Sequence, residues 1–144
     1  MKKEMRNIGL DNGIYVKSNK REITREMLPS SIIYPFENDY GGNVEIVYWR
    51  KCWGMRNEVM NSFGWRSSDP EQYIFDIDTH EQVLKLIEII ASWINEDRWN
   101  EEADSIWDYS EMRETLIQNV INLSMIYIFM ATNPDVYLQF YDSY

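Results

Sequence analysis

The residues best suited to recognition chemistry stand together between positions 48 and 56. If this segment is a helix, Trp49, Trp53 and Arg56 fall on one face, at positions i, i+4 and i+7. Indole rings beside a guanidinium can stack a nucleobase and pair with a phosphate, or anchor a protein interface. The alternative is that both indoles belong to the core and Arg56 reaches past them to solvent. The segment predicts a partner- or ligand-binding surface made of Tyr48, Trp49, Arg50, Lys51, Trp53 and Arg56.

Catalytic motifs are scarce by comparison. The sequence has no Walker loop and no GxGxxG or GxSxG motif. With only Cys52 and His80 as cysteine and histidine, it lacks a zinc-finger ligand set. Asp76 and Asp78 alternate on a strand candidate, an arrangement that suits a divalent cation but equally suits a solvated strand end. Since these aspartates and His80 are the only catalytic constellation, we expect a protein that is not an enzyme and binds no metal or cofactor.

The charge is unevenly spread along the chain. The net charge is −10, with +3 on residues 1–66 and −13 on residues 67–144. A solvated acidic surface explains this distribution, and so does a negative face that meets a basic partner. Direct binding of nucleic acid is not expected, because phosphate contacts need a basic footprint. The predicted acidic partner face consists of Glu96, Asp97, Glu101, Glu102, Asp104, Asp108 and Glu111.

Cysteine use and hydropathy indicate a compartment. A single cysteine excludes an intramolecular disulfide and favours a reducing environment. The start of the chain has charge but no apolar segment of a signal peptide. The longest apolar run, Leu123 to Ala131, is broken only by Ser124 and is shorter than the roughly 20 residues that span a membrane. We therefore expect a soluble protein of the cytoplasm with no membrane contact.

The elements that must position these residues follow from periodicity. A length of 144 residues indicates a single domain, 1–144. Apolar spacing predicts long helices over residues 44–63, from Thr79 to about Asn95, and over about 109–132. Thr79 and Gln82 match a capping box. Strand candidates are residues 13–17, 73–77 and 136–141, with an edge strand between Pro29 and Pro35. The predicted fold is α+β, with three long helices packed on a small antiparallel sheet.

Residues Tyr48, Trp49, Arg50 and Lys51, followed by Met55 and Asn57, resemble a group of small uncharacterised proteins of bacteriophages and prophages of Firmicutes. The similarity continues through Tyr73, Thr79 and Gln82-Val83-Leu84 to the aromatic stretch Tyr137–Tyr144, and it covers roughly residues 44–144. The chain departs from the group where Arg56 replaces a histidine and Glu58 a tryptophan. The resemblance implies a phage or mobile-element setting and no particular activity.

These observations lead to two competing hypotheses. In the first, the chain is a non-enzymatic accessory protein that binds and inhibits a host bacterial defence protein, as anti-CRISPR proteins do, and its acidic half mimics nucleic acid. In the second, it is a sponge for a cyclic nucleotide or another small anionic immune signal. Its pocket would then be lined by Tyr48, Trp49, Arg50, Lys51 and Arg56, in a monomer or shared between subunits of a homo-oligomer.

Overall fold

The computed structural model describes residues 11–39, 41–64, 72–98 and 109–143, and of residues 72, 73, 109 and 110 the backbone alone. Its elements are the strands β1 (Asp11–Ser18), β2 (Val44–Arg50), β3 (Gln72–Ile77) and β4 (Val136–Ser143), the 3-10 turn η1 (Arg25–Met27) and the helices α2 (Trp53–Ser62), α3 (His80–Asn95) and α4 (Tyr109–Thr132).

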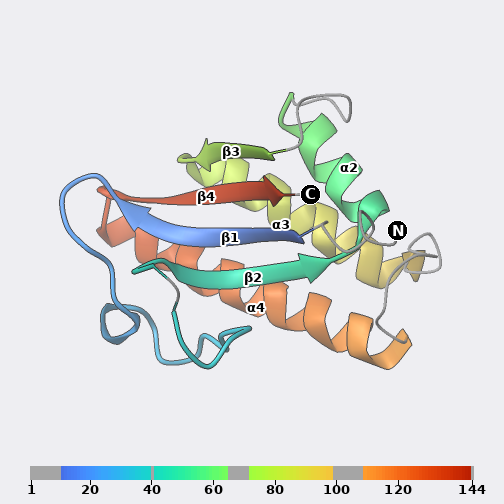
Figure 1. Cartoon of the computed structure of the whole chain (residues 1–144), viewed down its shortest axis with the longest axis horizontal. Helices are drawn as coiled ribbons and strands as arrows, with labels where there is room; N and C mark the ends of the chain where they lie inside the picture. The colour runs from blue at the N-terminus through green and yellow to red at the C-terminus, as the bar shows by residue number, and fades with distance from the viewer. Residues whose placement is uncertain (1–10, 40, 65–71, 99–108, 144) are drawn as a thin grey trace, which may run out of the picture.

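The strands form one antiparallel sheet in the order β2-β1-β4-β3. Helices α3 and α4 lie behind this sheet in Figure 1, and no described helix covers its front face. The inward residues of β4 are Val136, Leu138, Phe140 and Asp142, all buried, and they alternate with half-exposed outward residues. This period of two is expected for a sheet with only one face packed on a core. Within the described part of the chain, this front face, which we call the open face of the sheet, is therefore not covered by a helix.

The predicted α+β class, with an antiparallel sheet and three helices, is confirmed. The description of all three helices as long is wrong for α2, which has 10 residues against 16 in α3 and 24 in α4. The capping box predicted at Thr79 is present: Gln82 N–H donates to Thr79 Oγ1 over 3.1 Å, and Gln82 Oε1 accepts from Thr79 N–H.

The helix predicted over residues 44–63 is also wrong in its first part, because residues 44–50 form β2. β-branched and aromatic side chains dominate this stretch and favour a pleated, half-buried surface. The chain bends at Lys51, whose φ of 59° lies in the left-handed region, and helix α2 begins only at Trp53. Trp49 and Arg56 therefore belong to different elements and cannot share a helical face.

Helix α4 forms part of the core. By length and composition alone, residues Glu111–Thr132 suffice to cross a membrane, although a third of the apolar window is buried. In the fold this helix packs against α3 and β2, and Leu116, Leu123 and Ile126 are fully buried. Packing in the core accounts for these buried apolar residues, whereas Ile121 and Ile128 of the same helix are exposed.

Candidate functional site

The open face of the sheet carries tyrosines and carboxylates around a central glycine. Gly13 in β1 is paired with Tyr48 of β2 on one side and with Tyr141 of β4 on the other. A Cβ atom at Gly13 would overlap Glu45 Oε2 and would lie only 2.5 Å from Tyr141 Cε2. Only glycine therefore lets the Glu45 and Tyr141 side chains meet across β1. These two side chains fill the space that a side chain at position 13 would need.

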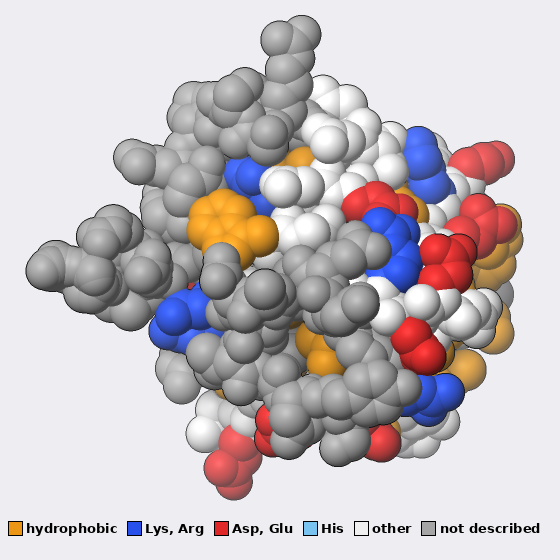
Figure 2. Space-filling model, turned by 90° about the vertical axis from the view of Figure 1, so that its right-hand side faces the viewer, with side chains coloured by type: hydrophobic (Ala, Val, Ile, Leu, Met, Phe, Trp, Pro, Cys, Tyr) orange, Lys and Arg blue, Asp and Glu red, His pale blue; other side chains and the backbone are white. Residues whose placement is uncertain are grey.

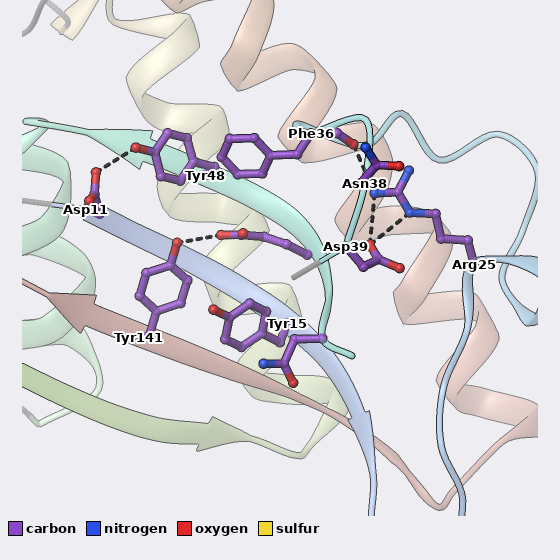
Figure 3. A pocket seen from close by; sticks show the side chains of 10 residues that line it. Asp11, Tyr15, Arg25, Phe36, Asn38, Asp39, Tyr48 and Tyr141 are labelled. Carbon is purple, nitrogen blue, oxygen red and sulfur yellow. Dashed lines mark hydrogen bonds and ion pairs between the residues drawn. The ribbon is translucent and has the colours of Figure 1, made fainter. Parts of the chain in front are cut away.

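Glu45 and Tyr141 also line a cavity of about 270 Å³, which we call the aromatic–acidic pocket (Figure 3). Strands β1, β2 and β4 supply its floor, and the segment 36–39 supplies one wall. Its lining residues are Asp11, Tyr15, Arg25, Phe36, Asn38, Asp39, Asn43, Glu45, Tyr48 and Tyr141.

Glu45 is the most perturbed acid of this pocket. The Tyr141 hydroxyl donates to Glu45 Oε2 over 2.7 Å. Burial raises the pKa of Glu45 to about 7; the hydrogen bond from Tyr141 opposes this rise and the nearby Asp11 carboxylate adds to it. Glu45 forms no ion pair with any residue that the structure describes. A carboxylate that is partly desolvated and lacks a cation attracts a positive group.

Asp11, two residues before Gly13, is a second carboxylate of the pocket that accepts a hydrogen bond from a tyrosine hydroxyl. The Tyr48 hydroxyl points at Asp11 in Figure 3 and donates to its Oδ1 over 2.6 Å. Arg50 Nη1 lies 3.5 Å from the same oxygen. Burial, followed by the hydrogen bond to Asp11, raises the pKa of Tyr48 to about 12. Asp11 Oδ2 and Glu45 Oε1 accept no hydrogen bond within the described part of the chain, so each carboxylate has one oxygen left for a ligand.

Aromatic rings line the pocket between these carboxylates. The Tyr15 and Tyr141 rings are stacked, with centroids 5.0 Å apart and planes 22° apart. The Phe36 and Tyr48 rings meet edge to face at 4.8 Å. Aromatic faces carry partial negative charge and attract cations. Rings and carboxylates therefore favour the same kind of ligand.

Arg25 is the one cation among the residues that line this pocket, but its guanidinium is held at the rim (Figure 3). Its Nε donates to Asp39 Oδ1 over 2.9 Å, and its Nη atoms donate to the carbonyls of Phe36 and Glu37. The guanidinium also lies over the Tyr34 ring, 4.2 Å from the centroid. These contacts fix the 36–39 wall, and they leave Glu45 without a cation.

The structure does not bring the predicted Trp/Arg surface together. Trp49 is fully buried in β2 and donates from Nε1 to Asn119 Oδ1 over 2.7 Å. Arg56 is 1 % exposed and pairs with the buried Asp142 over 2.7 Å. The prediction that these two side chains face a partner or an anionic ligand is therefore wrong. They lie inside because strand alternation turns Trp49 inward and an ion pair satisfies Arg56.

The other members of that set lie at or near the surface. Tyr48 lines the aromatic–acidic pocket, and Arg50 lies beside it through its contact with Asp11. Lys51 and Trp53 are half-buried at the turn into α2, where the Arg56 guanidinium lies 5.8 Å from the Trp53 ring.

The predicted acidic partner face is only partly described. Glu96, Asp97 and Glu111 are exposed. Glu101, Glu102, Asp104 and Asp108 lie outside the described residues. Figure 2 views this end of the molecule and shows acidic and basic side chains interspersed among the described residues. Arg98 beside this face pairs with Glu58 over 2.9 Å.

The catalytic candidates Asp76 and His80 make contacts that do not form a catalytic arrangement among the described residues. Asp76 accepts a hydrogen bond from Gln139 over 3.1 Å, and the His80 ring meets Tyr127 edge to face at 5.1 Å. Among the described residues, no group of three or more His, Cys, Asp or Glu side chains could hold a metal ion.

Asp11, Tyr15, Glu45 and Tyr141 were not identified from the sequence. A usable signal exists in the alternation Asp11-x-Gly13-x-Tyr15, which places these residues on one face of a strand. Finding Glu45 and Tyr141 requires the strand order, because β4 lies beside β1 although it is far along the chain.

Comparison with known proteins provides no template for this site. No protein-family model matches the chain, and searches of curated proteins and of solved structures found no match either.

Proposed function

We propose that the protein is a non-enzymatic binding protein whose aromatic–acidic pocket takes a guanidinium group from a basic protein partner. The observation that supports this proposal is the Glu45 carboxylate, partly desolvated and without a cation among the described residues. An arginine side chain would supply the missing charge.

A guanidinium suits this site better than an ammonium. Glu45 Oε1 is a carboxylate oxygen left open, and a planar fork of N–H donors matches the geometry of a carboxylate. The flat guanidinium can also lie against the tyrosine rings, as the Arg25 guanidinium already lies on Tyr34. The compact, strongly hydrated lysine ammonium gains less from such planar surroundings.

The wider role in this proposal is inhibition of a host defence protein, as in anti-CRISPR proteins. It is supported by the phage resemblance of residues 44–144 and by the net charge of −10, which attracts a basic nucleic-acid groove. An arginine in such a groove that normally binds phosphate would instead enter the pocket. The protein would then block the groove as an acidic mimic of nucleic acid. An anionic-signal sponge gains no such support, since Asp11, Asp39 and Glu45 line the pocket against a single Arg25.

The pocket is tested by NMR titration with three capped amino acids that differ in their head group: arginine, lysine and the neutral arginine analogue citrulline. We expect saturable shifts at Gly13, Glu45 and Tyr141 with arginine, weaker shifts with lysine and none with citrulline. Glu45→Gln should weaken arginine binding about tenfold, as expected for a lost charged hydrogen bond. The matched control is Asp76→Asn, the same charge change on the same sheet face but outside the pocket. Equal affinity for citrulline and arginine would contradict the proposal.

A further inference from the structure

A second hollow, of about 220 Å³, lies between the segment 33–35 and helix α4. Its lining residues are Ile33, Tyr34, Pro35, Ile46, Tyr48, Thr115, Gln118, Asn119 and Asn122, none of them charged. We call it the amide hollow. It shares only Tyr48 with the aromatic–acidic pocket, so an inference about it does not depend on the function proposed above.

Asn122 shows what an amide on this face of α4 does. Its Nδ2 donates to the carbonyl oxygen of Ile33 over 2.7 Å, and its Oδ1 accepts from the Ile33 N–H over 3.0 Å. The same Nδ2 also donates to the Ile46 carbonyl of β2 over 2.9 Å. A side-chain amide of this helix thus pairs with both polar groups of one main-chain residue, as a neighbouring strand would. Asn122 itself is 1 % exposed and already engaged.

Asn119 and Gln118 carry amide groups that are not engaged in this way. Asn119 is 4 % exposed, and its Oδ1 accepts from the buried Trp49 indole over 2.7 Å. That bond fixes the amide so that its NH₂ group is the end left to donate. Neither this NH₂ group nor the Gln118 amide forms a hydrogen bond with another described residue. Since both residues line the hollow, a ligand that enters it meets these groups.

We propose that the amide hollow binds the main chain of an extended, uncharged peptide. Gln118 pairs with the N–H and C=O of one peptide residue, as Asn122 pairs with Ile33, and Asn119 donates to the carbonyl of a neighbouring residue. A charged group is disfavoured, because it would lose hydration in a hollow whose lining has no opposite charge. The peptide would lie beside the Ile33–Pro35 segment, which already occupies part of the same helix face.

The test uses capped tri-alanine as the probe and follows the ¹⁵N side-chain amide signals of Gln118 and Asn119 by NMR. We expect saturable shifts of both signals. Gln118→Leu should weaken binding about tenfold, the effect of losing an amide pair. Gln118→Glu should do the same, and it keeps the shape of the side chain. The matched control is Gln139→Leu, a change of the same type on the open sheet face, which should leave binding unchanged.

The outcomes separate the possible occupants. Tri-alanine methylated at its central peptide nitrogen should bind at least tenfold more weakly than the parent peptide, since it lacks the N–H that Gln118 accepts from. Equal binding of both peptides would overturn the proposal. Shifts with uridine and none with the peptide would also overturn it and assign a nucleobase instead. Arginine binding at the aromatic–acidic pocket, measured in the same Gln118 variants, should not change, so the two proposals can fail independently.

Discussion

At the scale of single residues, the aromatic–acidic pocket depends on the absence of a side chain at Gly13. Its neighbours Glu45 and Tyr141 already occupy the space where a side chain would stand. The pocket chemistry and the local packing are therefore linked at one position, and a change there should affect both.

Gly13→Ala should lower the free energy of unfolding by about 1–3 kcal/mol, because the added methyl group overlaps Glu45 and Tyr141. It should also abolish arginine binding, since the two side chains must move apart. Urea denaturation measures the first effect and NMR titration the second. The double variant with Glu45→Ala removes the closest overlap, so the two stability effects should not be additive. Strict additivity would show that Gly13 and Glu45 do not contact each other in this way.

The raised pKa of Glu45 predicts a pH dependence of stability. Its pKa is about 7 in the folded protein against 4.5 for the ordinary group, so between these values the folded state binds more protons than the unfolded state. Stability therefore falls as pH rises through this window. Glu45→Gln removes the effect, and the variant should gain stability relative to the parent from about pH 5 to about pH 8, by about 1–2 kcal/mol after a discount for solvent exposure. Parallel stability curves for the two proteins would contradict the shifted pKa.

At the scale of elements, the sequence was informative where a local signal determined the structure. Helix α3 was predictable because the Thr79–Gln82 capping box and an apolar stripe mark its start and its inward face. The strand β2 was not, because its apolar residues also fit a helical spacing. The turn at Lys51 carries no glycine to mark it. The aromatic–acidic pocket could not be predicted from the sequence for another reason: its residues come from strands that only the order β2-β1-β4 brings together.

The buried pair of Arg56 and Asp142 joins α2 to β4 and gives an element-scale prediction. Arg56 donates from Nε and Nη2 to the two oxygens of Asp142, over 3.0 and 2.7 Å. Asp142→Asn should cost about 3–5 kcal/mol of stability, because it removes the charge of a buried, doubly hydrogen-bonded partner of the guanidinium. Thermal unfolding measures the loss. Asp135→Asn, which breaks the exposed pair with Arg21, should have little effect and serves as the control. Equal effects of the two substitutions would show that Arg56 gains no stability from this partner.

At the scale of the whole molecule, the net charge of −10 and the pocket should act on binding in different ways. The overall field attracts a basic partner over long distances and is screened by salt, whereas the desolvated Glu45 site is screened much less. We therefore expect a capped hexa-arginine peptide to bind with a steep salt dependence. Glu45→Gln should weaken its binding by a similar factor at every salt concentration and leave the slope unchanged. Reversing exposed charges at Glu96, Asp97 and Glu111 should instead flatten the slope and leave the binding of a single capped arginine almost unchanged.

Calorimetric titrations at several salt concentrations distinguish the two effects. Binding of hexa-arginine that responds neither to salt nor to these reversals would exclude the acidic mimicry of nucleic acid. Arginine binding in the aromatic–acidic pocket would then be tested only by whether Glu45→Gln weakens it.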